Sequence, residues 1–146
     1  MTTNAKFTEQ IAVLAVLNPV SVAASTDVTT WVPVADYHRI AAFIQTGVLG
    51  ASATLDAKLR QATDASGTGA KDVTGKEITQ IVKASGDNKQ AFIELRVEDL
   101  DTEGAFTHVA LSATVGTAAS IFGAQLLGIS PRYMPTTNVN TVVQTV

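Results

Sequence analysis

The chain contains no cysteine among its 146 residues, which excludes disulfide bonds and thiolate metal sites. Charge is also scarce, because only 16% of the residues are charged, whereas an average soluble protein has roughly 25%. The net charge is −3 and the ten lysines and arginines form no basic run. This balance argues against a protein that binds nucleic acid through phosphate contacts. A chain with so little charge must bury most of its surface or cover part of it with other subunits.

Long hydrophobic runs are absent as well. The longest apolar stretch is Ile11–Leu17, which is far shorter than the roughly 20 residues that a membrane-spanning helix needs. We therefore expect no membrane partner. The first residues lack a charged region followed by a long apolar core, and Asn18-Pro19 interrupts the next apolar segment. We therefore expect no signal peptide.

Alternation of apolar and polar residues is the main pattern that is present. In Ala53–Gln61, alanine and leucine occupy every second position and polar residues occupy the others. Residues 91–98 repeat this pattern, with Ile93, Leu95 and Val97 on one side. A period of two is typical of half-buried strands. These segments predict two strands of a sheet that has one solvated face.

Further segments rich in β-branched residues lie between clusters of glycine, proline, asparagine and serine. The predicted strands are Gln10–Leu17, Val28–Val34, Arg39–Gln45, Ile78–Ala84, Phe106–Val115 and Ser120–Ile129. A short helix competes with the last of these over Thr117–Leu127, but Gly123 and the flanking β-branched residues favour a strand. Ser85–Asn88 and Asp99–Gly104 read as hairpin connections.

About eight short strands at this spacing predict an all-β protein, either a sandwich, a jelly roll or a barrel. We expect a jelly-roll-like β-sandwich with extended terminal arms. Residues 1–135 would form the single domain. Residues 136–146 would form a C-terminal extension, because they follow a proline-bounded break and contain no charged side chain.

No constellation of residues predicts catalysis or a cofactor. The two histidines, His38 and His108, lack an obvious partner, and each is far more readily explained as structural. Gly67-Thr68-Gly69 is a turn and not a phosphate-binding loop, because the rest of either glycine-rich motif is missing. We therefore expect a protein that is not an enzyme, with no cofactor and no metal site.

The acidic cluster in Glu98–Glu103 could supply oxygen ligands to a cation. It lacks the full calcium-loop pattern, so a solvated turn is the favoured reading.

Candidate contact residues are aromatic, proline-restricted or in the C-terminal extension. Trp31 and Tyr37 would pack in the core or at an interface. Arg132 and Tyr133 lie between two prolines, which restrict the backbone on both sides, and both residue types are common in interfaces. The uncharged extension would add to a sheet edge. The interface candidates are Trp31, Tyr37, Arg132, Tyr133, Val139, Val142 and Val143.

The ordered set Trp31–Ile40, Phe43–Gly47, Leu59–Lys71 and Leu126–Pro135 resembles small virion proteins of tailed bacteriophages and gene-transfer particles, in particular capsid decoration (cement) or head auxiliary proteins. The resemblance covers roughly residues 28–135. It implies a jelly-roll-like fold, many copies on each particle and contact with the major capsid protein. It brings no catalytic residue with it.

The leading expectation is therefore a bacteriophage head decoration protein that bridges major capsid subunits and other copies of itself. It would be made in the bacterial cytoplasm and would reside on the capsid surface. Two alternatives remain open at this point. One is another virion component of the neck, tail or head-spike base. The other is a carbohydrate-binding β-sandwich that uses Trp31 and Tyr37 as an aromatic platform.

Overall fold

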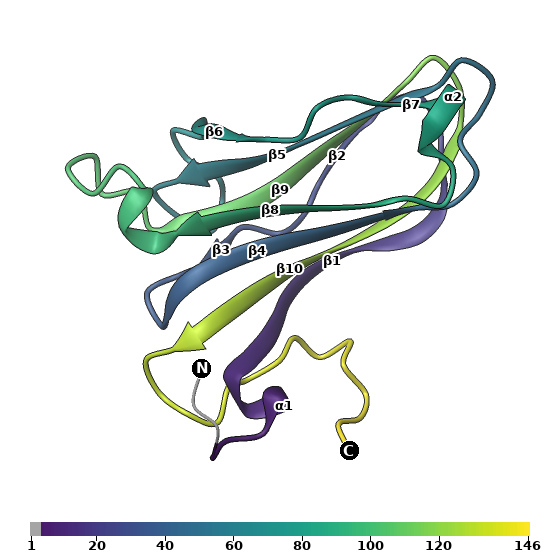
Figure 1. The fold of residues 1–146 in the computed structure, drawn as a ribbon. Coiled ribbons are helices and arrows are strands. Elements are labelled where there is room, and N and C mark those ends of the chain that lie inside the picture. Colours follow the sequence, from purple (N-terminus) through teal and green to yellow (C-terminus); the bar gives the residue numbers. More distant parts are fainter. Residues whose placement is uncertain (1–3) are drawn as a thin grey trace.

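The computed structural model describes residues 4–146, which form two antiparallel β-sheets packed face to face (Figure 1). The first, sheet A, has four strands in the order β1 (Ile11–Val22), β10 (Ser120–Pro131), β4 (Tyr37–Thr46) and β8 (Gln90–Arg96). The second, sheet B, has the central order β2 (Thr26–Val28), β9 (His108–Gly116), β5 (Thr54–Ala62) and β6 (Lys71–Glu77).

Two short strands complete sheet B. β3 (Val32–Pro33) pairs with β9 beyond β2, and β7 (Ile81–Val82) pairs with β5 beyond β6. The helices in the described residues are single turns, namely α1 (Phe7–Gln10), α2 (Lys83–Gly86) and the 3-10 turn η1 (Val97–Asp99). None of the helices in residues 4–146 has the length and hydropathy needed to cross a membrane.

The order of the strands is that of a jelly roll. Because β2 and β3 share one neighbour, and β6 and β7 share another, each pair is one interrupted strand, which leaves eight strand positions. The chain crosses from one sheet to the other at nearly every connection, and among the described strands it stays in one sheet only between β2 and β3 and from β5 through β7. This is the double-sheet arrangement of two Greek keys. The predicted all-β, jelly-roll-like sandwich of about eight strands is confirmed.

Both predicted hairpins are wrong. Ser85–Asn88 leads from β7 in sheet B to β8 in sheet A, and Asp99–Gly104 leads from β8 back to β9 in sheet B. Each connection therefore arches over the end of the sandwich. A turn signal marks where the chain reverses, but it does not specify which sheet the next strand will join.

Some predicted strand boundaries also need correction. The predicted strand Ile78–Ala84 shrinks to β7 and runs into helix α2, while β6 was not predicted. Only Val73 of β6 is buried, so this edge strand carries almost no alternation. The predicted strand Val28–Val34 is divided into β2 and β3.

Asn18-Pro19 lies inside β1 and does not end it. The register of β1 against β10 shifts between Leu17 and Val20, which accommodates the proline. Since β1 is an edge strand, the missing N–H of Pro19 is tolerated there.

The core fills the space between the two sheets. Its largest fully buried side chains include Phe122, Ile40, Leu59 and Leu111. Tyr37 also lies in the core and is only 7% exposed. Its ring packs over Gly128, where an added Cβ would lie 2.6 Å from the ring carbons. Glycine is therefore required at this position of β10.

Candidate functional site

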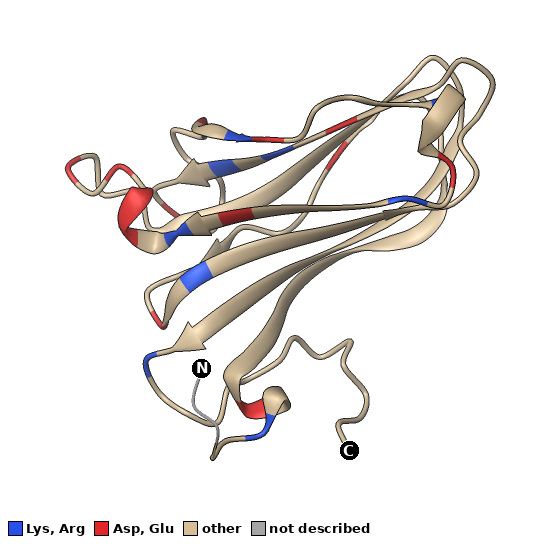
Figure 2. Cartoon of the chain, viewed as in Figure 1, with Lys and Arg blue, Asp and Glu red and all other residues tan. Residues whose placement is uncertain are grey.

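The outer face of sheet A, which points away from sheet B, is largely apolar. Cross-strand pairs bring Ile11 beside Ile129 and Val13 beside Leu127. Strands β1 and β10 carry no charged residue, as Figure 2 shows. Further along the sheet, the rings of Phe43 and Phe92 pack with their centroids 4.9 Å apart. Sheet A is therefore apolar on both faces along much of β1 and β10, whereas the outer side of β8 carries Gln90, Glu94 and Arg96.

The C-terminal segment covers part of this face. In Figure 1 it lies with α1 on the side of sheet A away from sheet B. The Asn138 side-chain oxygen accepts a hydrogen bond of 2.8 Å from the Val13 N–H, and the Val139 N–H donates one of 2.8 Å to the Val13 carbonyl. The Thr136 hydroxyl donates to the Ile11 carbonyl at 3.1 Å. The segment is thus held against the free edge of β1.

The interface candidates in this segment have different environments. Val139 and Val142 are half-buried, whereas Val143 is 94% exposed. Tyr133 is 78% exposed, and the Arg132 Nε donates a 2.7 Å hydrogen bond to the Ala35 carbonyl. That bond holds the start of the segment against the loop before β4.

Five of the exposed large apolar side chains lie on the two terminal segments. We call this group the terminal surface, and its members are Phe7, Tyr133, Met134, Val143 and Val146. Each of them is more than half exposed. Because Thr136 contacts Ile11 directly after α1, the N-terminal and C-terminal segments meet at one side of the sandwich.

The aromatic platform of Trp31 and Tyr37 is absent from the structure. Tyr37 is buried, and burial, together with the nearby Asp36 carboxylate, raises the pKa of its phenol. Trp31 is half-buried against the loop at Gly67, where a Cβ would lie 2.5 Å from the indole nitrogen. Gly67 has a φ of +81°, a conformation that glycine adopts readily. These two side chains therefore do not form a shared exposed surface for a sugar.

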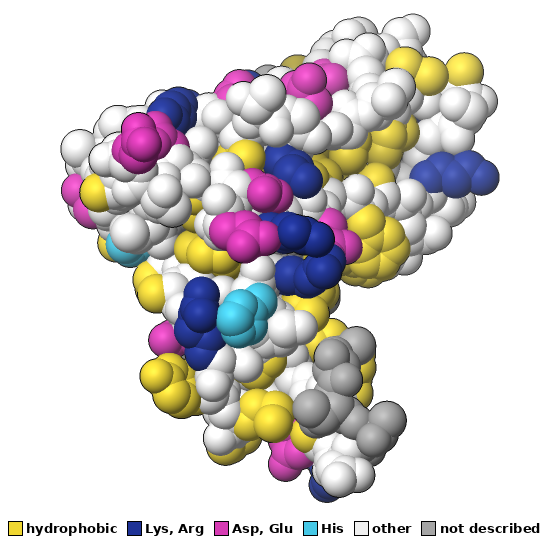
Figure 3. Space-filling model, turned by 60° about the vertical axis from the view of Figure 1, so that its left-hand side comes forward, with side chains coloured by type: hydrophobic (Ala, Val, Ile, Leu, Met, Phe, Trp, Pro, Cys, Tyr) yellow, Lys and Arg dark blue, Asp and Glu magenta, His cyan; other side chains and the backbone are white. Residues whose placement is uncertain are grey.

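A small basic hollow of about 200 Å³ lies near the start of β4. It is lined by His38, Arg39, Arg96, Val97, Glu98 and Arg132. Arg39 pairs with Glu94, and Arg96 pairs with Glu98 at 3.1 Å. Among the described residues, Arg132 has no acidic partner. Figure 3 shows basic, acidic and histidine side chains close together on this side of the protein.

The outer face of sheet B, in contrast, is polar and paired. Asp72 on β6 accepts hydrogen bonds from Lys58 at 2.7 Å and Arg60 at 3.0 Å. The bond from Lys58, followed by its charge and by Arg60, lowers the pKa of the Asp72 carboxyl. These exposed pairs explain why every second residue of β5 is polar.

Three carboxylates of the predicted acidic cluster, those of Glu98, Asp99 and Asp101, accept hydrogen bonds from this chain's own donors. Asp101 pairs with Lys71 and accepts a hydrogen bond from the Gly104 N–H, and the Lys71 bond is the main cause of its lowered pKa. Glu98 pairs with Arg96. Within residues 4–146, no three acidic or histidine side chains are placed to hold a metal ion.

An uncharged groove of about 530 Å³ lies on the outer face of sheet A, near the C-terminal end of β4 and the N-terminal end of β8. Its walls come from β1, β4, β10 and the loop before β8. Four side-chain amides line it, those of Asn18, Gln45, Asn88 and Gln125, together with the ring of Phe43. Sequence reasoning missed this groove because these residues are far apart along the chain.

No family model and no curated protein matches the chain. Solved structures do show similarity. A chain of the cowpea mosaic virus top component, a naturally occurring empty particle, is 10% identical, with a TM-score of 0.44 over 88% of this chain and 91% of that chain. The SPBc2 prophage-derived protein YomS is 8% identical, with a TM-score of 0.41 over 76% and 90% of the two chains.

A xylan-binding module is similar to the same degree, with 11% identity and a TM-score of 0.41 over 77% of this chain and 78% of that one. Because the identities and TM-scores are this low, the similarities carry no information on function.

Proposed function

We propose that this protein is a non-catalytic structural component of a bacteriophage virion, a decoration protein that binds the major capsid protein and adjacent copies of itself. The observation that carries the proposal is the terminal surface. Phe7 at 65% exposure, Tyr133 at 78% and Met134 at 51% lie on the segments that flank the sandwich. Exposed large apolar side chains on adjoining segments are typical of an interaction surface.

Attachment would use burial of the terminal surface. Fully burying one large apolar side chain contributes about 1.5–3 kcal/mol, so a few such residues supply a contact that is weak alone. Symmetric copies on a shell repeat that contact many times, and linked contacts bind far more tightly than single ones. Arg132 would add a pair with a carboxylate of the partner, since its guanidinium has no acidic partner among the described residues.

Binding to particles that lack this chain tests the proposal. Purified protein is mixed with such particles and centrifuged through a density gradient, and the bound fraction is measured by mass spectrometry. We expect the full chain to travel with the particles at high copy number. A chain without residues 136–146 should bind more weakly, and Tyr133→Ser should do so without removing any backbone contact.

Val48→Ser provides the matched control. Val48 is also exposed, at 55%, but it follows the other end of β4, away from the terminal surface. It should bind as the unaltered chain does. Full binding by both the shortened chain and Tyr133→Ser, with both folded, would refute attachment through the terminal surface.

A further inference from the structure

One wall of the uncharged groove on sheet A forms where β1 closely approaches a glycine of β10. Gly123 points outward on β10 between Ile121 and Gln125, opposite Gln45 on β4. Pro19 of β1 lies close above it, 3.0 to 3.2 Å from where a Cβ would be. A side chain at position 123 would crowd Pro19, so glycine allows the irregular part of β1 to lie close against β10 and to form one wall of the groove. The volume of about 530 Å³ falls within the range of small-molecule sites.

Four polar side chains of the groove are amides without a partner among the described residues. In the described residues, the side chains of Asn18, Gln45, Asn88 and Gln125 make no hydrogen bond within the protein. Each amide offers two N–H donors and one carbonyl acceptor. A hydroxyl group also donates and accepts, so a ligand with many hydroxyls can pair with all four amides.

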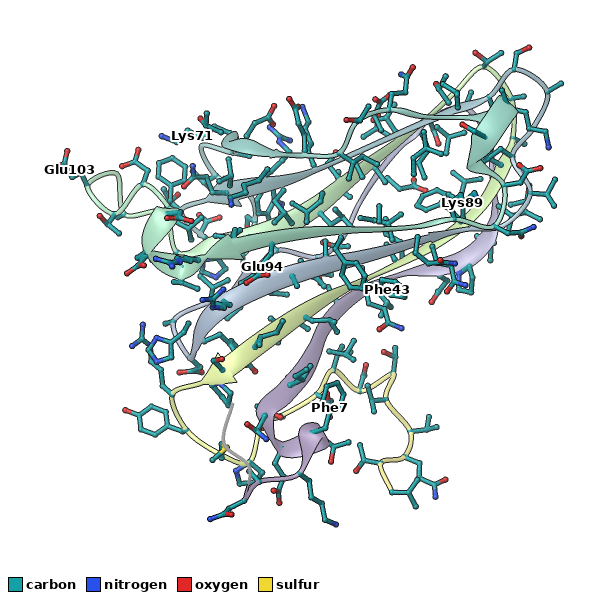
Figure 4. The ribbon with its side chains drawn as sticks, in the orientation of Figure 1. Phe7, Phe43, Lys71, Lys89, Glu94 and Glu103 are labelled. Atoms are coloured by element: carbon teal, nitrogen blue, oxygen red, sulfur yellow. The ribbon has the colours of Figure 1, made fainter. Side chains whose placement is uncertain are left out.

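The lining contains no lysine, arginine, aspartate or glutamate. A charged ligand would lose water there without gaining an opposite charge, which is unfavourable. Phe43 adds a ring midway along β4 (Figure 4), next to Gln125 in the register of the sheet. The face of an aromatic ring is partly negative and attracts the weakly positive C–H groups of a sugar ring.

We propose that this groove binds a neutral oligosaccharide, with the four amides pairing with its hydroxyls and Phe43 packing against a sugar ring. The proposal goes beyond attachment to a particle and does not depend on it. Thr141 is the one residue of the C-terminal segment in the lining. A protein attached through its terminal surface could therefore still present the groove to solvent.

Nuclear magnetic resonance of the full chain labelled with ¹⁵N tests the proposal, because side-chain NH₂ groups give their own signals. The probes are maltotriose, cellotriose, xylotriose and β-1,4-galactotriose, with trigalacturonate as the charged comparison. We expect at least one neutral probe at millimolar concentration to shift the NH₂ signals of Gln45 and Gln125. Trigalacturonate should shift neither.

Substitutions then assign the site. Gln45→Ala and Gln125→Ala should each weaken binding of that probe about tenfold, as expected when the hydrogen bonds of one amide are lost. Gln80→Ala is the matched control, because Gln80 is an exposed amide that pairs with Asp56 on sheet B. It should leave binding unchanged. The backbone signals of each variant report whether it is folded.

Three results would overturn the proposal. The first is the absence of any shift with all four neutral probes. The second is equal binding of trigalacturonate. The third is a set of groove signals that shift on dilution of the protein alone, which would mean that a second copy occupies the groove. None of these results bears on particle binding, so failure here is separate from failure of the proposed attachment.

Discussion

The two sheets enclose one core but present different surfaces to the outside. On sheet B, the outward positions of β5 carry threonine, aspartate, lysine and arginine, and Asp72 pairs with two of them. On sheet A, Val13 and Leu127 face outward from strands that have no charge at all. An antiparallel sheet with one solvated face normally alternates between apolar and polar residues. Sheet B follows this rule. Sheet A departs from it on β1 and β10, and we expect other segments or ligands to cover the outer side of these two strands.

The largest expected effect separates the inner and outer faces of sheet A. Phe122→Ala should lower the free energy of unfolding by about 3–5 kcal/mol, because Phe122 is 1% exposed and its loss leaves a cavity. Phe92→Ala makes the same chemical change on the outer face, where the ring is 70% exposed. It should cost less than about 1 kcal/mol. Urea denaturation measures both, and equal costs would show that the outer face is already part of the core.

A smaller effect concerns the edge of sheet A. Asn138→Ala removes the acceptor of the Val13 N–H and should lower the free energy of unfolding by about 1 kcal/mol. Hydrogen exchange at the Val13 amide should become faster. Asn140→Ala is the control, since the Asn140 side chain is exposed and makes no hydrogen bond among the described residues. Unchanged exchange in Asn138→Ala would mean that the C-terminal segment does not protect β1.

The smallest effect should appear on sheet B, on acidification. The pKa of Asp72 is lowered in the folded protein by its bonds with Lys58 and Arg60. The unfolded chain therefore binds more protons near the ordinary aspartate pKa of 3.8. The stabilisation is present above that pH and is lost as the pH falls through the lower, folded pKa.

Urea midpoints measured from about pH 6 down to about pH 2 should show this loss, and Asp72→Asn should reduce it. Asp36→Asn is the control, because no lysine or arginine pairs with Asp36 in the described residues. A pH dependence that Asp72→Asn leaves unchanged would indicate that the other paired carboxylates, such as Asp101, account for it.

Local patterns predicted the half-buried strands well. β5 and β8 were predicted nearly to the residue, because each has one buried and one solvated side and therefore alternates. β6 was missed because it is an edge strand with a single buried residue. The predicted strand Gln10–Leu17 stops short of Asn18-Pro19, whereas β1 continues through it, because β1 has a free edge there and the lost N–H costs little.

The candidate site was less predictable than the strands. Tyr133 and Val143 are exposed, whereas Tyr37 is buried with its ring packed over Gly128. An aromatic residue at the start of a strand can face either side, and the sequence pattern around Tyr37 does not distinguish them. The groove depends on Gly123 lying opposite Gln45, a register that only the pairing of β10 with β4 creates.

The amino-acid sequence alone determined that this protein is all-β, which side of its main strands is buried, and that its C-terminal segment is uncharged. These properties depend on neighbouring residues, whose spacing sets the face on which each side chain lies. Only the tertiary structure decided the crossings between sheets, the docking of Asn138 on Val13 and the groove of four amides. These features join residues far apart in the chain, and strand pairing across such distances is selected by packing of the whole core and not by any local signal.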